Sequence, residues 1–161
     1  MRTATKPFAE LTAADLMTRD VTVIPRHMSL RSAAHMLSQA RVSGAPVVDS
    51  RGACVGVISS TDFVRWAEGR RPTRHLEPFS ECVCSDWQIC DAESLPTEEV
   101  GGYMTPDPVT APHATRVGEL ARMMLDAHIH RVIIVDEARR PVGVVSSTDI
   151  LAAVATFESR L

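Results

Sequence analysis

Two stretches of this sequence are copies of one another, and this repetition constrains the fold more than any other feature. The run Met17–Asp20 returns as Met104–Asp107, and the run Gly56–Asp62 returns as Gly143–Asp149. The offset is constant without a gap, because 104 − 17 and 149 − 62 both equal 87. An internal repeat fixes the architecture before any local feature does. Each copy spans roughly 55 residues, which is marginal for an independent core, so we expect the copies to fold as one pseudo-symmetric unit.

The composition is that of an ordinary globular protein. Of the 161 residues, 45% are hydrophobic and 23% charged, and the formal net charge is −3. An acidic balance argues against a nucleic-acid partner, and no stretch approaches the ~20 apolar residues of a membrane span. The start of the chain lacks the apolar core of a signal peptide, so we expect a cytoplasmic protein with reduced cysteines and no membrane partner.

The first repeat alternates strand and helix signals. Thr12 and Asp15 form a capping-box pattern ahead of a short helix, and residues 21–24 are β-branched and end at a proline. Ser29 is suited to cap a helix whose apolar positions recur at helical spacing. Further strands are expected at residues 45–48 and 54–58, followed by a helix that begins at Ser59 or Ser60 and runs to about residue 68.

The second repeat has the same pattern, with Thr115 as the expected cap of its long helix and strands at residues 132–135 and 142–145. Thr97 is followed by two glutamates, which is the pattern of a capped, acidic first turn, so a helix is expected to begin there. The predicted fold class is α+β, with two β-α-β-β-α repeats packed as one module. The expected domains are repeat 1 at 10–68, a cysteine-containing linker at 69–96 that packs on the module, and repeat 2 at 97–156.

These motifs together resemble a tandem pair of cystathionine-β-synthase (CBS) domains, also called a Bateman module. The marks are Met-Thr at the start of each repeat, Ser43–Asp49 in the middle, and Gly-h-h-Ser-x-x-Asp at the end, where h is apolar. The resemblance implies two clefts between the repeats, in which many members of the family bind adenosine-containing ligands.

The end motif has a physical basis for such binding. Ser59 and Ser146 stand where a strand meets a helix N-terminus, which favours phosphate, and Asp62 and Asp149 lie one turn further on, where a carboxylate can accept ribose hydroxyls. The resemblance places adenine against the first strand of each repeat and the backbone that begins the second. The first expected site is Thr22, Val23, Ile24, Gly44, Ala45, Pro46, Ser59, Thr61 and Asp62. The second is Val109, Thr110, Ala111, His130, Arg131, Val132, Ser146, Thr148 and Asp149.

The predicted function is a stand-alone regulatory module that senses AMP, ADP, ATP or NAD, with an adenine nucleotide as regulatory ligand, no catalytic cofactor and no enzymatic activity. One alternative is a structural dimerisation module, because capping alone explains Ser and Asp at a helix start. Another is a redox- or metal-responsive module through Cys82, Cys84 and Cys90, although a Cys-x-Cys pair is poor spacing for zinc. We read Cys54 as a core residue.

Two partners are expected besides the nucleotide. One is an effector protein of unknown identity, since nothing in the chain reads as an output domain. The other is a second copy of the chain, in a homodimer formed through the apolar helix faces 30–37 and 117–124.

Overall fold

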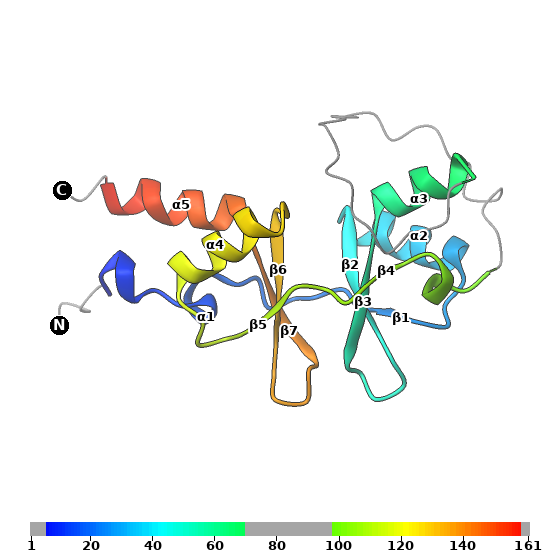
Figure 1. Ribbon diagram of the computed structural model, residues 1–161, viewed down its shortest axis with the longest axis horizontal. Coiled ribbons are helices and arrows are strands. Elements are labelled where there is room, and N and C mark those ends of the chain that lie inside the picture. The colour runs from blue at the N-terminus through cyan, green and yellow to red at the C-terminus, as the bar shows by residue number, and fades with distance from the viewer. Residues whose placement is uncertain (1–5, 70–97, 159–161) are drawn as a thin grey trace. The chain divides into compact units, whose positions relative to one another are not determined.

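The computed structural model describes residues 6–69 and 98–158, and it confirms a mixed α+β fold with two sheets (Figure 1). The chain forms two compact units. Unit 2 is Thr22–Pro108, and unit 1 combines the residues up to Val21 with those from Val109 onward. The segment that leads into each sequence repeat therefore belongs to the unit of the other repeat. The linker cysteines Cys82, Cys84 and Cys90 lie outside the described residues.

Unit 2 is built on a four-stranded sheet in the order β1-β2-β3-β4. Strands β1 and β2 are parallel, and the other neighbours are antiparallel. Helices α2 and α3 lie on one side of this sheet (Figure 1). Its elements are β1 (Ile24–Pro25), α2 (Leu30–Ala40), β2 (Gly44–Val48), β3 (Cys54–Ser59), α3 (Ser60–Ala67), the 3-10 helix η3 (Val100–Gly102) and β4 (Thr105–Pro106).

Unit 1 repeats this plan with a three-stranded sheet in the order β5-β6-β7. The place of β4 is taken by a single bridge between Thr18 and Val144. Its elements are the 3-10 helix η1 (Phe8–Glu10), α1 (Ala13–Leu16), β5 (Thr110–Pro112), α4 (Val117–Asp126), β6 (Arg131–Val135), β7 (Pro141–Ser146) and α5 (Ser147–Glu158). None of the described helices is long and apolar enough to cross a membrane.

The segments that lead into the two repeats (residues up to 21 and residues 98–108) supply backbone carbonyls to the first turns of α4 and α2. Ser29 caps α2 as predicted, with its side chain accepting from the Ser32 amide at 3.2 Å. The prediction of Thr115 as the cap of α4 is wrong, because the N-cap is Arg116 and it makes no side-chain cap bond. The Val117 amide instead donates to the carbonyl of Leu11 at 2.9 Å. A backbone carbonyl from a distant segment thus replaces the missing side-chain cap.

Two element boundaries also differ from expectation. The first strand is Ile24–Pro25 rather than residues 21–24, since its parallel pairing with β2 begins only at Ile24. The α-helix expected from Thr97 is a 3-10 turn over Val100–Gly102. Two consecutive glycines within that turn disfavour a continuing α-helix.

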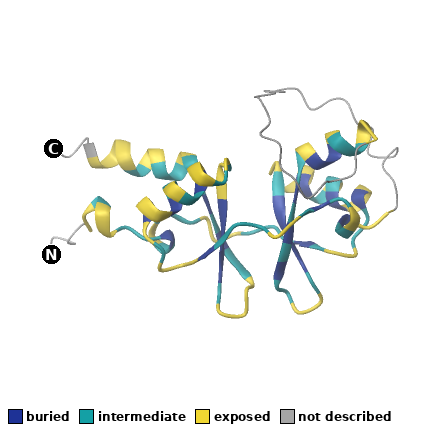
Figure 2. Ribbon diagram, in the orientation of Figure 1, coloured by how far each residue is buried: buried dark blue, intermediate teal, exposed yellow. Residues whose placement is uncertain are grey.

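The long helices turn their apolar faces inward, so each unit has a core of its own (Figure 2). The buried helix positions are Leu30, Ala33, Leu37, Val117, Leu120 and Met124. These helix faces were expected to form a homodimer. They are buried within their own units instead, so the prediction of these residues as the interface was wrong. Cys54 is 2% exposed in β3, as predicted for a core residue.

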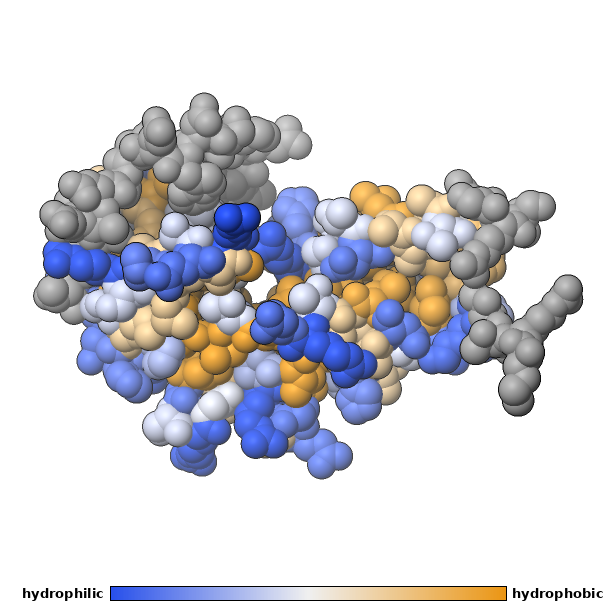
Figure 3. Space-filling model, turned by 180° about the vertical axis from the view of Figure 1, so that it is seen from behind, coloured by the Kyte–Doolittle hydropathy of each residue, from blue (hydrophilic) through white to orange (hydrophobic). Residues whose placement is uncertain are grey.

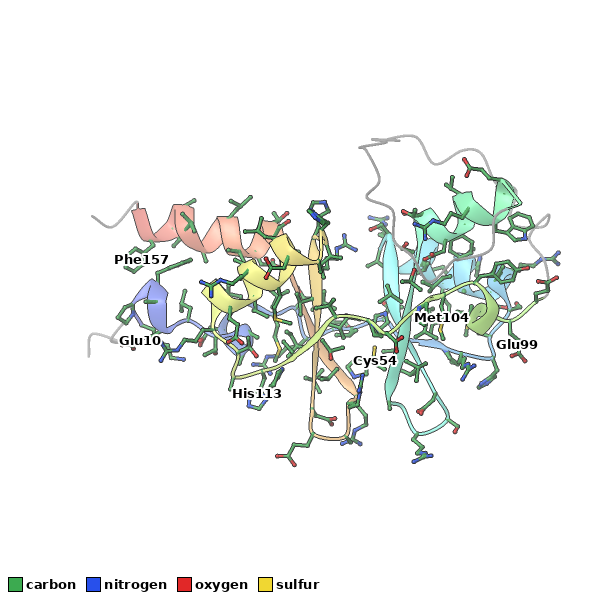
Figure 4. All side chains as sticks on the ribbon, viewed as in Figure 1. Glu10, Cys54, Glu99, Met104, His113 and Phe157 are labelled. Atoms are coloured by element: carbon green, nitrogen blue, oxygen red, sulfur yellow. The ribbon has the colours of Figure 1, made fainter. Side chains whose placement is uncertain are left out.

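A methionine from each lead-in segment docks on a strand glycine. Met104, 7% exposed, lies beside β3 (Figure 4), and a Cβ at Gly56 would come within 2.5 Å of its Sδ. Met17 approaches Gly143 of β7 in the same way. Glycine in these strands therefore makes room for a methionine side chain, which explains why Met-Thr and the strand glycine occur together in both repeats.

Candidate functional site

In each unit, the repeat's second strand (β2 or β6) begins beside the junction between the third strand and the following helix, where the end motif lies. Gly44 pairs with Ser59 in unit 2, and Arg131 pairs with Ser146 in unit 1. One hydrogen bond closes each junction, from the Ser60 amide to the Ser43 carbonyl and from the Ser147 amide to the His130 carbonyl, both at 2.9 Å. Residues of two neighbouring strands thus meet at one end of each sheet, beside a helix N-terminus.

The predicted site residues of each set fall within one unit, but they differ in exposure. The buried members are Asp62 and five apolar residues, Ile24, Ala45, Pro46, Ala111 and Val132. Because the five apolar side chains lie in the cores, they can offer a ligand only backbone atoms. The partly exposed members are Thr22, Val23, Gly44, Ser59, Val109, Thr110, Ser146 and Asp149, and the exposed ones are Thr61, His130, Arg131 and Thr148.

Both aspartates of the end motif belong to capping arrangements. Asp62 Oδ2 accepts from the Ser59 amide at 2.7 Å and from the Ser59 hydroxyl at 3.0 Å. Asp149 Oδ2 accepts the equivalent bonds from Ser146, at 2.7 and 2.6 Å. The structural role considered from the sequence is therefore present at both junctions. It uses one oxygen of each carboxylate.

The second oxygen of Asp62 is also engaged. The Thr105 hydroxyl, from β4, lies 3.3 Å from Asp62 Oδ1, and the Arg65 guanidinium lies 3.6 Å from the same oxygen. The Asp62 side chain is only 2% exposed. Burial raises the pKa of this carboxyl above its usual value, against the lowering effect of Ser59, Arg65 and Thr105.

Asp149 has fewer neighbours than Asp62. It is partly exposed, and among the described residues its only side-chain hydrogen bonds are those with Ser146. The two carboxylates occupy equivalent positions in the repeat, yet their second oxygens are in different surroundings.

Thr105 and Arg65 are the residues that sequence reasoning missed. Thr105 lies 43 positions after Asp62, so local spacing does not place it there. A signal was present in the Met-Thr motif, whose methionine docks on Gly56 of the strand that leads to Asp62. Arg65 is one helical turn from Asp62, and that spacing permits contact on a helix surface.

Glycine and arginine occupy equivalent places at the two junctions. A Cβ at Gly44 would lie 3.0 Å from the Ile58 carbonyl oxygen and 3.1 Å from Ser59 Cβ, so the pairing in unit 2 favours glycine. Arg131 holds the same position in unit 1 with an exposed side chain. At this position unit 1 therefore carries a cationic side chain where unit 2 has none.

No group of three metal-ligating side chains occurs within residues 6–69 and 98–158. The cysteine-based alternative concerns Cys82, Cys84 and Cys90, which are outside these ranges.

Comparison with known proteins identifies the family. The profile of the CBS domain matches residues 13–69 and 100–156, once for each repeat. The chain belongs to the CBS domain family and carries two copies of the domain.

The curated relatives include proteins of two kinds. One is the chloroplastic CBS domain-containing protein CBSX2 of Arabidopsis thaliana, 25% identical over 88% of this chain and 63% of the relative. Another is the 5'-AMP-activated protein kinase subunit gamma-3 of Sus scrofa, 30% identical over 84% of this chain and 23% of the relative. The chain thus spans less than two thirds of either protein.

Solved structures share the fold. CBSX2 in complex with AMP superposes with a TM-score of 0.69 at 23% identity, covering 91% of this chain and 98% of that one. The CBS domain pair of protein MJ0100, in complex with 5'-methylthioadenosine and S-adenosyl-L-methionine, gives 0.68 at 23% identity and covers 91% and 97%.

Proposed function

We propose that this chain is a regulatory module that binds an adenosine-containing ligand such as AMP, ADP, ATP or NAD at one or both of its strand–helix junctions. The observation that carries the proposal is the twofold occurrence of one arrangement, in which a helix N-terminus, a serine and a carboxylate meet the start of a strand. Relatives with the same fold hold AMP, 5'-methylthioadenosine or S-adenosyl-L-methionine.

The chemistry of the junction suits a nucleotide. Amides at the first turns of α3 and α5 favour phosphate, and Thr61 and Thr148 in the same turns are exposed residues whose hydroxyls can donate to it. A carboxylate at Asp62 or Asp149 suits ribose hydroxyls, which donate to it. The proposed contacts of Ile24, Ala45, Pro46, Ala111 and Val132 are made by backbone atoms, because their side chains are buried. Thr22, Val23, Gly44, Val109 and Thr110, with His130 and Arg131, complete the surfaces that would face the base.

Regulation would follow from linkage rather than from catalysis, and no catalytic cofactor is part of the proposal. A ligand that prefers one conformation shifts the population toward it by the difference in its affinities for the two states. The output would then be read by an effector protein that contacts the favoured state.

The structural alternative is favoured by the capping bonds, which account for Ser59, Asp62, Ser146 and Asp149 without a ligand. Isothermal titration calorimetry with AMP, ATP and NAD decides between them, on protein whose ultraviolet spectrum after denaturation shows no copurified nucleotide. The regulatory proposal predicts heat with one of the three below millimolar concentration. Absence of heat with all three would leave the structural alternative.

We also propose that the chain forms a homodimer through α4 and α5 rather than through the faces first expected. Leu125 is 74% exposed and Leu151 is 67% exposed, and α5 carries no charged residue from Ile150 to Phe157. Hydrophobic residues are visible on the surface of unit 1 in Figure 3. A solvent-facing helix normally carries charge on its outer face, so a second copy is the partner that would cover this one in an isologous contact.

Light scattering at micromolar concentration tests the dimer. The wild type should give the dimer mass, and Leu151→Glu should give the monomer mass with unchanged circular dichroism. Val64→Glu is the matched control on α3, where Val64 is 51% exposed, and it should remain dimeric. A wild-type monomer would refute the proposal. We also propose that the protein is cytoplasmic, where its cysteines would be thiols.

A further inference from the structure

We infer that the two junctions are not equivalent, and that Asp149 is the carboxylate that receives ribose hydroxyls while Asp62 is closed by Thr105 and Arg65. This inference rests on the proposed function and assigns the ligand to one of its two sites. It concerns two residues that the sequence repeat makes identical, in motifs that differ by a single residue over Gly56–Asp62 and Gly143–Asp149.

The two carboxylates differ in their capacity to accept further hydrogen bonds. An ionised carboxylate has about four lone-pair positions on its two oxygens. Asp62 has two of these taken by Ser59, and its remaining oxygen faces the Thr105 hydroxyl and the Arg65 guanidinium. Asp149 has two taken by Ser146. Two adjacent ribose hydroxyls need two acceptor positions, and Asp149 has that capacity without displacing a neighbour.

The two carboxylates also differ in access, and this difference outweighs the difference in acceptor capacity. The Thr105 contact at 3.3 Å is longer than an ordinary O–H···O bond, and the Arg65 contact at 3.6 Å is an ion pair rather than a hydrogen bond. Bond strength alone would therefore not exclude a ligand. Burial does so, because a carboxylate that is 2% exposed cannot meet a ribose unless the groups over it move. Asp149 is partly exposed.

The difference has a cause in the chain. The position equivalent to Arg65 in the second repeat is Ala152, which cannot reach a carboxylate. The position equivalent to Thr105 is Thr18, which is exposed, and its hydrogen bonds to other described residues are backbone bonds with Val144. One substitution and one change in the placement of a threonine thus leave the carboxylate of unit 1 open.

Calorimetry on paired variants tests the assignment, with AMP, ATP and NAD as probes in turn. We expect one ligand per chain. Asp149→Asn should weaken binding by ten- to a hundredfold, as expected for loss of hydrogen bonds to a charged group, whereas Asp62→Asn should change it less than threefold. The 2'-deoxy analogue of the binding probe should lose affinity for the wild type but much less for Asp149→Asn.

A second variant pair keeps the test independent of whether Asp62→Asn folds. Arg65→Ala combined with Thr105→Val removes both groups over Asp62, and it should raise the stoichiometry from one ligand per chain to two. Thr18→Val is the matched control in the first lead-in segment, and it should leave the stoichiometry at one.

The possible failures are distinguishable. Two equal sites in the wild type, loss of binding in Asp62→Asn but not in Asp149→Asn, or a stoichiometry of one in the double variant would each overturn the inference while the proposed function stands. No heat with any probe on the wild type would overturn the proposed function and this inference with it.

Discussion

The docking of Met104 on Gly56 makes one substitution informative about the whole of unit 2. In Gly56→Ala the new methyl group would lie 2.5 Å from Met104 Sδ and 2.9 Å from the Thr105 carbonyl oxygen. The methionine is flexible but nearly buried, and the carbonyl belongs to backbone held in the pairing of β3 with β4. The clash therefore cannot be relieved without moving the lead-in segment.

The magnitude follows from two opposing effects. Overpacking of this kind costs ~1–3 kcal/mol, and the smaller conformational freedom of alanine in the unfolded chain returns ~0.4–1 kcal/mol. Because a backbone atom is involved, we expect a net loss of about 1–2 kcal/mol from the free energy of unfolding. That corresponds to a melting temperature lower by roughly 2–8 °C for a chain of this size.

Urea unfolding followed by circular dichroism measures the loss, with three companion variants. Gly118→Ala is the control, because nothing lies within 4 Å of a Cβ there and alanine favours the helix α4, so its stability should rise slightly. Gly143→Ala should cost less than Gly56→Ala, because the three atoms nearest its Cβ all belong to the partly exposed Met17 side chain. Combining Gly56→Ala with Met104→Ala should cost less than the sum of the single changes. A Gly56→Ala protein as stable as the wild type would refute the docking.

Three further outcomes are expected. Ser29→Ala should lower the free energy of unfolding by about 1 kcal/mol through loss of the cap of α2, while Arg116→Ala should change it by less than about 0.5 kcal/mol, because α4 has no side-chain cap. Burial raises the pKa of Asp62, so the folded state holds more protons than the unfolded state between about pH 4 and that raised pKa, and stability should fall as pH rises across this window. In Asp62→Asn this dependence should be absent, and urea unfolding at pH 5 and pH 7 measures it in both proteins. The same change in unfolding free energy between the two pH values in both proteins would contradict the prediction. Treatment with a chelator should leave the melting temperature unchanged if the linker cysteines are packing groups, and stoichiometric zinc with unfolding on its removal would establish the metal alternative.

The sequence was sufficient for whatever depends on local pattern. The spacing of Leu30, Ala33 and Leu37 predicted the buried face of α2, and Ser29 predicted its cap, because both act within one or two turns of a helix. The constant offset of 87 residues predicted two similar substructures and, with the motifs, the family. The capping role of Ser59 and Asp62 was likewise readable, since the two residues are three positions apart.

Tertiary structure decided whatever depends on contacts between distant segments. No local signal shows that residues up to Val21 belong with the second repeat, or that Leu11 and Glu98 offer backbone carbonyls to the helices α4 and α2. The same holds for the burial of Asp62 and its contact with the Thr105 hydroxyl, which repetition alone would assign equally to Asp149 and Thr18. Helix and strand periodicity records which face of an element is apolar, whereas the partner of that face is set by packing across the whole chain. Two nearly identical motifs therefore acquire different surroundings, through the packing of Thr105 and Thr18 and through the replacement of Arg65 by Ala152 outside the motif.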